Sequence, residues 1–184
     1  NKAVLTGTPI RQELLEGSPE RALEFTGFTK DKPVIMIIGG SLGAAAVNDA
    51  VRAVLPELLK TFQVIHLCGK GKLDESLKNT KGYVQYEYIK KELADLFALA
   101  DVVISRAGAN AICELSALKK PNLLIPLSAR ASRGDQILNA RSFERMGYSV
   151  VLEEEEITNE KLLETIHSLY KNRASYADDM SKSK

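Results

Sequence analysis

The sequence has few of the features that mark secreted, membrane-spanning or nucleic-acid-binding proteins. Only two of its 184 residues are cysteines, and Cys68 and Cys113 lie far apart in apolar stretches without a C-x-x-C spacing. This cysteine usage fits a reducing, cytosolic setting. Lys and Arg number 25 against 24 Asp and Glu, which leaves a formal net charge of +1. A chain so close to neutral has no bulk field that would recruit nucleic acid or anionic lipid, so any phosphate site must be local.

Long hydrophobic runs are also missing. No apolar stretch approaches the roughly 18 residues that a membrane-spanning helix needs, and the start lacks the basic-then-apolar layout of a signal peptide. No Asp-x-Asp pair or His/Cys cluster suggests a metal site, and no cofactor is expected. Residues 1–7 resemble a short strand entering a turn, without an initiator Met or a helix cap. We therefore expect a cytoplasmic protein that is an excised part of a longer one.

Short β-branched runs alternate with amphipathic stretches from residue 32 onward, which is typical of a parallel sheet covered by helices. The expected strands are residues 34–38, 63–67, 83–86, 102–105, 122–125 and 149–152. The expected helices lie near residues 44–60, 73–79, 92–100, 109–118, 136–146 and 159–172. Near-continuous apolar strands imply burial on both faces. The predicted fold is therefore α/β, a Rossmann-like parallel sheet with helices on both faces.

Composition divides the chain into three parts. Residues 1–31 are more polar and contain Pro9 and Pro19, so we expect a linker with one or two short helices. Residues 32–172 form the Rossmann-like domain, and residues 173–184 are either a polar tail or a truncated helix. Helical periodicity in the first long helix leaves four side chains for its outer face: Asn48, Asp49, Arg52 and Glu57.

A glycine-rich turn, GGSLGA at residues 39–44, stands between the first strong strand and a helix. Glycines let the backbone approach a phosphate, while the start of the helix offers unpaired N–H groups and a favourable dipole. The motif alone favours binding only slightly over a tight turn without a ligand. It matches neither the G-x-G-x-x-G fingerprint nor the P-loop, and the second strand ends in HLCG rather than in an acidic residue. NAD binding and ATP hydrolysis are therefore disfavoured.

A second strand-to-helix turn, SRAGANAICE at residues 105–114, has small residues where the helix begins. These residues open the backbone, and Glu114 lies less than two turns into the helix, where it can face the same crevice. A carboxylate there can accept hydrogen bonds from both hydroxyls of a ribose, while the N–H groups at the helix start bind a diphosphate. Taken alone, Glu114 is more simply explained as a solvated helical glutamate.

A third polar loop, residues 126–140, follows a buried strand and leads into a helix that begins with GDQILNA. Loops beyond the carboxyl ends of parallel strands are where open α/β sheets bind ligands, and amides suit sugar hydroxyls. Arg130 and Arg133 can meet phosphate, although an exposed arginine pair on a loop is more often only solvated.

The three motifs, together with TGTPIR at residues 6–11, resemble the MurG family of peptidoglycan N-acetylglucosaminyltransferases, which convert lipid I to lipid II. The resemblance covers essentially the whole chain, as the carboxyl-terminal domain of that family. It implies a GT-B fold, in which two Rossmann-like domains face a cleft and the carboxyl-terminal one holds UDP-N-acetylglucosamine. The ordered series of motifs is far more specific than any one of them.

The resemblance also assigns donor-binding roles to particular residues. Arg11 and Ser41 match residues near the diphosphate, and Gly43 belongs to the same turn as Ser41. Ile89 matches a residue whose backbone meets uracil, and Glu114 matches the ribose-binding glutamate. The phosphate cradle matches the helix start at Ala107, Gly108, Ala109 and Asn110. Gln136 matches a glutamine that touches sugar hydroxyls, but the family often has a second glutamine where this chain has Asp135, which affects the detail of those contacts.

The family's remaining chemistry lies outside this chain. Its acceptor loops and proposed general-base histidine belong to the amino-terminal domain, so no catalytic residue is expected here. His66 is assigned to a buried strand end and His167 to the terminal helix. The resemblance implies lipid I binding and contact with the cytoplasmic face of the membrane through the other half only. Two alternatives stay open: the donor domain of a related GT-B diacylglycerol glycosyltransferase, and a non-catalytic nucleotide-sugar-binding subunit.

Overall fold

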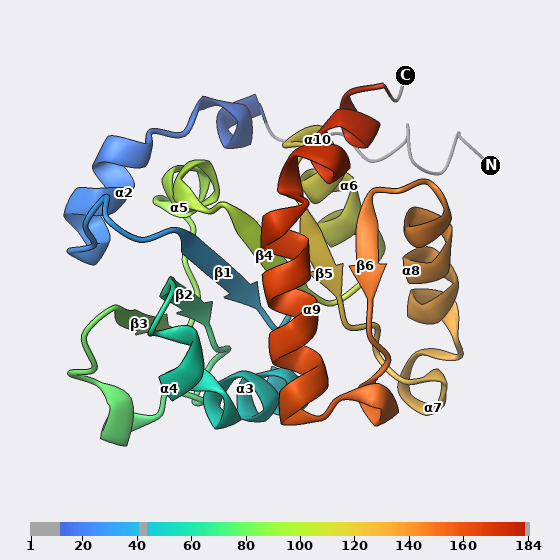
Figure 1. The fold of residues 1–184 in the computed structure, drawn as a ribbon, viewed down its shortest axis with the longest axis horizontal. Coiled ribbons are helices and arrows are strands. Elements are labelled where there is room, and N and C mark those ends of the chain that lie inside the picture. Colours follow the sequence, from blue (N-terminus) through green and yellow to red (C-terminus); the bar gives the residue numbers. More distant parts are fainter. Residues whose placement is uncertain (1–11, 41–43, 183–184) are drawn as a thin grey trace.

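The computed structural model describes residues 12–40 and 44–182, whose strands form one six-stranded parallel sheet (Figure 1). The sheet order is β3-β2-β1-β4-β5-β6. The strands are β1 (Val34–Ile38), β2 (Gln63–Leu67), β3 (Tyr83–Tyr86), β4 (Val102–Ser105), β5 (Asn122–Leu124) and β6 (Ser149–Val151). Four have the expected bounds, and β5 and β6 end one residue earlier than expected. The predicted parallel sheet is confirmed.

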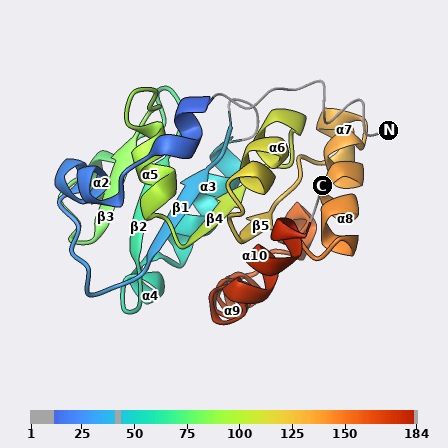
Figure 2. The same cartoon turned by 90° about the horizontal axis from the view of Figure 1, so that it is seen from above.

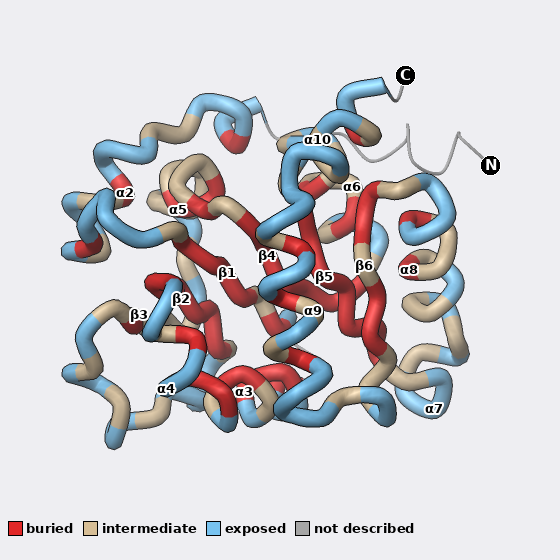
Figure 3. Tube along the Cα trace, viewed as in Figure 1, coloured by how far each residue is buried: buried red, intermediate tan, exposed pale blue. Residues whose placement is uncertain are grey.

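Helices cover both faces because the central strand β1 is apolar on both sides. Met36 and Ile37, neighbours on β1, are each 0% exposed and belong to separate cores on opposite faces. Figure 2 shows α6 and α9 on opposite sides of the strands, and Figure 3 shows the buried sheet between helices whose outer turns are exposed. One face is covered by α2 (Pro19–Thr26), α5 (Leu93–Leu99), α6 (Ala109–Ala117), α8 (Asp135–Arg145) and α10 (Arg173–Ser181), and the other by α3 (Ala44–Ala53), α4 (Leu55–Leu58) and α9 (Asn159–Lys171).

Two expected helices differ from the structure. The single helix expected near residues 44–60 is divided into α3 and α4, because Pro56 lacks the N–H that would continue the helix. The helix expected near residues 73–79 is only the short 3-10 turn η2 (Glu75–Leu77). The side chain of Gln85 pairs with both the N–H and the carbonyl of Asp74, each at 2.9 Å, and ties the start of this turn to β3. Among the described residues, no helix combines the length and apolar character required to cross a lipid bilayer.

The amino-terminal segment, with η1 (Gln12–Glu16) and α2, packs on α5. The N–H of Ser18 donates to Asp95 at 2.8 Å, and Arg21 donates to both oxygens of the same carboxylate at 3.2 and 3.0 Å. Arg21 thereby holds the pKa of Asp95 below its usual range. Gly17 lies so close to the backbone of Ala94 that no side chain fits there. The described part of the expected linker does contain two short helices, and both are docked.

The expected polar tail contains α10, which folds back onto the domain. Met180 is 3% exposed and joins the core that also holds Phe143 and Tyr148. Gly147, with a φ of 80°, turns the chain beside α10 at a place where a side chain would collide with Asp179. This helix is therefore part of the packed structure.

We expect Met180→Ala to lower the free energy of unfolding by about 1–2 kcal/mol. Deleting a buried Met side chain usually costs more, but a terminal helix can undock locally and so limits the loss. Thermal unfolding followed by circular dichroism should show a melting temperature lower by roughly 2–8 °C. Ser175→Ala, an exposed position on the same helix, is the matched control and should stay within about 0.5 kcal/mol. An unchanged melting temperature for Met180→Ala would show that α10 does not contribute to stability.

Candidate donor-binding site

The sheet changes its winding direction between β1 and β4, which pair although they are not consecutive in the chain. At such a switch point the loops at the carboxyl ends of the two strands diverge and leave a crevice that binds ligands. The two loops here are the glycine-rich turn after β1 and residues 106–108 after β4. The first two motifs of the sequence therefore converge at one place in the fold.

A cavity of about 430 Å³ opens beside this crevice. Its walls include Gly40, Leu67, Gly69, Ile89, Leu93, Phe97 and Glu114. Ile89, after β3, and Glu114, on α6, are thus brought to the same cavity. A mainly apolar wall with a few convergent polar groups is the usual build of a small-molecule site. Glu87 and Lys70 supply the other charged groups of the wall.

The position of Glu114 follows from the way α6 packs. Ile112 and Leu115, which are 3% and 2% exposed, face the core and leave the half-buried Glu114 at the cavity. The helix begins after Gly108, which provides no side-chain cap for the first N–H groups. Uncapped N–H groups at a helix start favour an anion. Ala107 is fully buried, whereas Ala109 and Asn110 are exposed on the first turn.

A second hollow, of about 550 Å³, is lined by Gly108 and Ala109 of this helix start and by Asp135 and Gln136 of α8. The loop after β5, with the short helix α7 (Ala129–Ser132), completes its wall. The helix start therefore lies between two recesses, one lined by Glu114 and the other by Gln136. Arg130 and Arg133, on α7 and at its end, are exposed.

Gln136 has a structural task that the sequence did not suggest. Its side-chain oxygen accepts hydrogen bonds from the N–H groups of Ala107 at 3.1 Å and Leu127 at 2.9 Å, and so joins the loops after β4 and β5. Asn139, one turn further along α8, donates to the carbonyl of Ala107 at 3.0 Å. Because the oxygen already serves two N–H groups, the side-chain nitrogen is the part of Gln136 best suited to meet a ligand. Asn139 was missed, although residues three apart on a helix share a face.

Three of the predicted binding residues, Arg11, Ser41 and Gly43, lie outside the described residues. Five of the seven predicted residues that the structure describes line one of the two cavities, while Ala107 and Asn110 line neither. Ile89 and Glu114 share the first cavity, while Gly108, Ala109 and Gln136 line the second.

A buried polar network lies beneath the β2 side of the site and corrects one expectation. Asn48 and Arg52 do not occupy the outer face of α3. Asn48 is 1% exposed and accepts from the ring of His66 at 2.7 Å, and Arg52 donates to the hydroxyl of Tyr83 at 3.3 Å. That hydroxyl lies 2.7 Å from the other ring nitrogen of His66. Asn48 also donates to the carbonyl of Cys68 at 2.9 Å, so the expected amphipathic face carries structural polar contacts instead.

Burial sets the ionisation of this network. Desolvation, with a smaller contribution from the Arg52 charge, lowers the pKa of His66 to about 3. Burial raises the pKa of Tyr83 to about 12. The neutral imidazole therefore donates to Asn48 and accepts from the Tyr83 hydroxyl. His66 is inside the sheet, as expected, and is 0% exposed, which removes it from any contact with a ligand.

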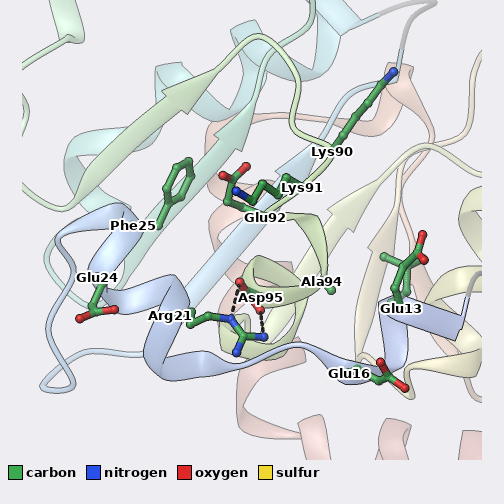
Figure 4. Close-up of a pocket in the computed structure, with 11 residues that line it drawn as sticks. Glu13, Glu16, Arg21, Glu24, Phe25, Lys90, Lys91, Glu92, Ala94 and Asp95 are labelled. Atoms are coloured by element: carbon green, nitrogen blue, oxygen red, sulfur yellow. Dashed lines mark hydrogen bonds and ion pairs between the residues drawn. The ribbon is translucent and has the colours of Figure 1, made fainter.

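A larger hollow, of about 610 Å³, lies between η1, α2 and α5 (Figure 4). Figure 4 shows the Arg21–Asp95 ion pair at its wall and Lys90 and Lys91 on the loop that continues from Ile89. None of the predicted binding residues that the structure describes lines it, so volume alone does not identify the site. Its acidic side chains are not gathered into a metal site, and nowhere in the described residues do three or more His, Cys, Asp or Glu form such a cluster.

Comparison with known families identifies the family to which this chain belongs. The Glycosyltransferase family 28 C-terminal domain matches residues 34–184. The chain belongs to this family. Its match spans all six strands and the loops of both recesses.

Relatives of this family 28 domain carry consistent names. The chain is 64% identical over 182 residues to a UDP-N-acetylglucosamine–N-acetylmuramyl-(pentapeptide) pyrophosphoryl-undecaprenol N-acetylglucosamine transferase of Lachnospira eligens, covering 99% of this chain and 51% of that relative. It is 62% identical over 184 residues to the protein of the same name from Clostridium perfringens strain SM101, covering 100% of this chain and 52% of that relative. The family 28 chain thus spans about half the length of these curated relatives.

Solved structures agree on the fold. The crystal structure of Acinetobacter baumannii MurG matches with a TM-score of 0.69 at 25% identity, covering 91% of this chain and 48% of that one. A spinosyn rhamnosyltransferase solved with thymidine diphosphate matches with a TM-score of 0.63 at 17% identity, over 83% of this chain and 40% of that one. The second likeness concerns the fold alone. The predicted fold, that of the carboxyl-terminal half of a GT-B glycosyltransferase, and the family resemblance are confirmed.

Proposed function

We propose that this chain is the UDP-N-acetylglucosamine-binding half of an inverting glycosyltransferase that transfers N-acetylglucosamine to lipid I and so makes lipid II for peptidoglycan. The observation that carries the proposal is the shared cavity of Ile89 and Glu114 beside the uncapped start of α6. The names of relatives at 64% and 62% identity supply the donor and the acceptor.

The two recesses divide the donor into its chemical parts. In this proposal, the uracil meets the backbone of Ile89, and the ribose hydroxyls donate to the carboxylate of Glu114. The diphosphate takes the N–H groups at the start of α6, from Gly108 to Asn110, where the helix dipole favours negative charge. The N–H of Ala107, also expected in this cradle, is already bonded to Gln136. The sugar then enters the second hollow and receives a hydrogen bond from the side-chain nitrogen of Gln136. Arg11, Ser41 and Gly43 are proposed to complete the diphosphate site.

The proposed chemistry depends on stabilising the leaving UDP. Charge that develops on the diphosphate is met by preorganised N–H groups at the helix start and by Arg11, which is the role that fixed dipoles perform in displacement reactions. Attack at the anomeric carbon from the opposite side inverts its configuration. The base that activates the acceptor hydroxyl is assigned to the other half of the longer protein.

The proposal also assigns the parts of the chain and their surroundings. Residues 1–31 are the interdomain linker, residues 32–172 the donor domain, and residues 173–184 its carboxyl-terminal extension. The complete enzyme is proposed to work at the cytoplasmic face of the cell membrane. Contact with lipid and with lipid I is assigned to the half that this chain does not include, because the near-zero net charge gives no attraction to anionic lipid.

We expect this chain to bind UDP and UDP-N-acetylglucosamine without transferring sugar to lipid I. Isothermal titration calorimetry measures the binding, and a radiolabel transfer assay with the purified chain measures turnover. Adding the missing half should restore transfer. A chain that binds neither nucleotide would contradict the donor-site assignment, and transfer by the chain alone would contradict the division of labour between the two halves.

A further inference from the structure

A buried arginine joins the ends of three neighbouring strands beneath the start of α6. Arg106 follows β4 directly, and its side chain is 5% exposed. Its Nη1 donates to the carbonyl oxygens of Ile125 at 3.0 Å and Pro126 at 3.2 Å, just beyond β5. Its Nη2 lies 2.6 Å from a carboxylate oxygen of Glu154, in the short helix η3 (Glu154–Glu156) beyond β6.

The sheet ladder ends just before these contacts. The last backbone bonds run from Ile125 N–H to Ser105 O at 2.8 Å and from Leu152 N–H to Leu124 O at 3.1 Å. Beyond them the strands diverge into the loops that line the site. Arg106 therefore continues the connection between β4, β5 and β6 with a side chain where the backbone ladder stops.

The same side chain also lies beside the other loop of the switch point. A Cβ placed on Gly40 would lie 3.8 Å from Cγ of Arg106, so the arginine stem runs beside the glycine-rich turn. The next residue, Ala107, is held by Gln136 and Asn139. The loops after β4, β5 and β6 are thus joined around one guanidinium, and the stem of the same side chain lies beside the loop after β1.

The charge of Arg106 is balanced within the protein. A buried charge is costly without a partner, and a buried ion pair is weak evidence for stability, so a role in geometry deserves a test. Glu154 is 31% exposed and supplies the opposite charge, at a distance that leaves little net field for a ligand. A planar guanidinium is suited to such a junction because its donors point in fixed directions.

We propose that Arg106 and Glu154 are positioning residues for donor binding. The pair holds the start of α6 in the geometry that accepts a diphosphate, and Arg106 acts through that geometry rather than as a direct phosphate ligand. This inference rests on the proposed binding of a UDP-sugar.

The test uses Glu154→Gln, because a positioning role and a direct role predict opposite results. Glutamine keeps an oxygen that can accept from Arg106 but removes the charge that holds and neutralises it. Positioning predicts that the Kd for UDP, measured by calorimetry, rises about three- to tenfold. A direct phosphate contact predicts the same or tighter binding, because the arginine charge is no longer balanced. Glu155→Gln removes the same charge from the exposed neighbour and is the matched control.

Uridine separates a positioning role from a general loss of structure. It has the base and ribose of UDP but lacks the diphosphate. A displaced helix start should therefore weaken the binding of UDP and leave the Kd for uridine within about twofold of the wild-type value. Arg106→Lys, which keeps the charge but loses the planar fork, should show the same selective loss with an unchanged dependence on salt.

Three outcomes decide the inference. If Glu154→Gln and Arg106→Lys both weaken the binding of UDP but not that of uridine, the positioning role is supported. If wild type binds UDP and Glu154→Gln binds it equally well or more tightly, the positioning role is wrong while the proposed function stands. If wild type itself does not bind UDP, both are wrong.

Discussion

Glu114→Gln should weaken UDP binding by about tenfold or more while leaving the fold intact. If the carboxylate accepts from both ribose hydroxyls, the amide removes the charge assistance and replaces one acceptor oxygen with a donor. The expected cost is about 1.5–3 kcal/mol, and about 1.4 kcal/mol corresponds to a factor of ten in Kd. The cavity that Glu114 shares with Ile89 places the carboxylate where a nucleoside would need it. Calorimetry with UDP measures the effect.

The 2′-deoxy nucleotide tests the same contact from the ligand side. It should bind the wild type more weakly than UDP does. Its affinity should fall less on Glu114→Gln, because the hydrogen bond from the 2′-hydroxyl is already absent. Glu164→Gln, an exposed glutamate on α9 at the opposite face of the sheet, is the matched control and should bind UDP like the wild type. The free energy of unfolding of Glu114→Gln should stay within about 0.5 kcal/mol of the wild-type value. Unchanged UDP affinity in this variant would assign Glu114 to the solvated surface.

Acidification should destabilise this chain through His66. The folded chain keeps the imidazole neutral down to a pKa of about 3, whereas the unfolded chain takes up a proton near its ordinary value of 6.5. Between these two values the unfolded state binds more protons, so the stability present above pH 6.5 is lost as the pH falls. The loss is about 1.4 kcal/mol per pH unit, or roughly 2–3 kcal/mol at pH 4.5. Urea unfolding at a series of pH values measures it.

The physical reason is visible in the hydrogen bonds of the ring. A proton on the nitrogen that faces Tyr83 would convert an acceptor into a second donor inside the sheet, near the Arg52 charge. His66→Gln should be less stable than wild type at pH 7, and the difference should narrow as the pH falls, because glutamine does not titrate. His167→Gln, at an exposed position on α9, is the matched control for replacing a histidine with glutamine. Parallel curves for His66→Gln would contradict the buried-imidazole account.

Elements that depend on their own residues were predicted well. The strand at 34–38 has its expected bounds because five consecutive apolar residues can be buried on both faces only inside a sheet. The start of α6 at Ala109 was also expected, since glycine and small residues mark the turn that precedes it. The prediction of a helix near 73–79 was wrong, because the structure has only the 3-10 turn η2 there, with its first residue bonded to the distant Gln85.

Partners of buried polar side chains were not predictable in the same way. Asn48 and Arg52 follow the periodicity of an exposed face, yet they bond to His66 and Tyr83 from β2 and β3. The run of glutamates at 153–156 carried no signal that one of them, Glu154, would pair with Arg106. Helical spacing states which side of a helix a residue occupies, but the groups opposite that side come from other parts of the chain.

The amino-acid sequence by itself determined the alternation of strands and helices, the parallel sheet and the family, because these follow from local hydrophobic period, turn residues and ordered motifs. Only the tertiary structure decided that Ile89 and Glu114 share a cavity, that Gln136 uses its oxygen to join two loops, and that Arg106 is paired with Glu154. These contacts depend on strand order and helix packing, which bring together groups that no local pattern connects.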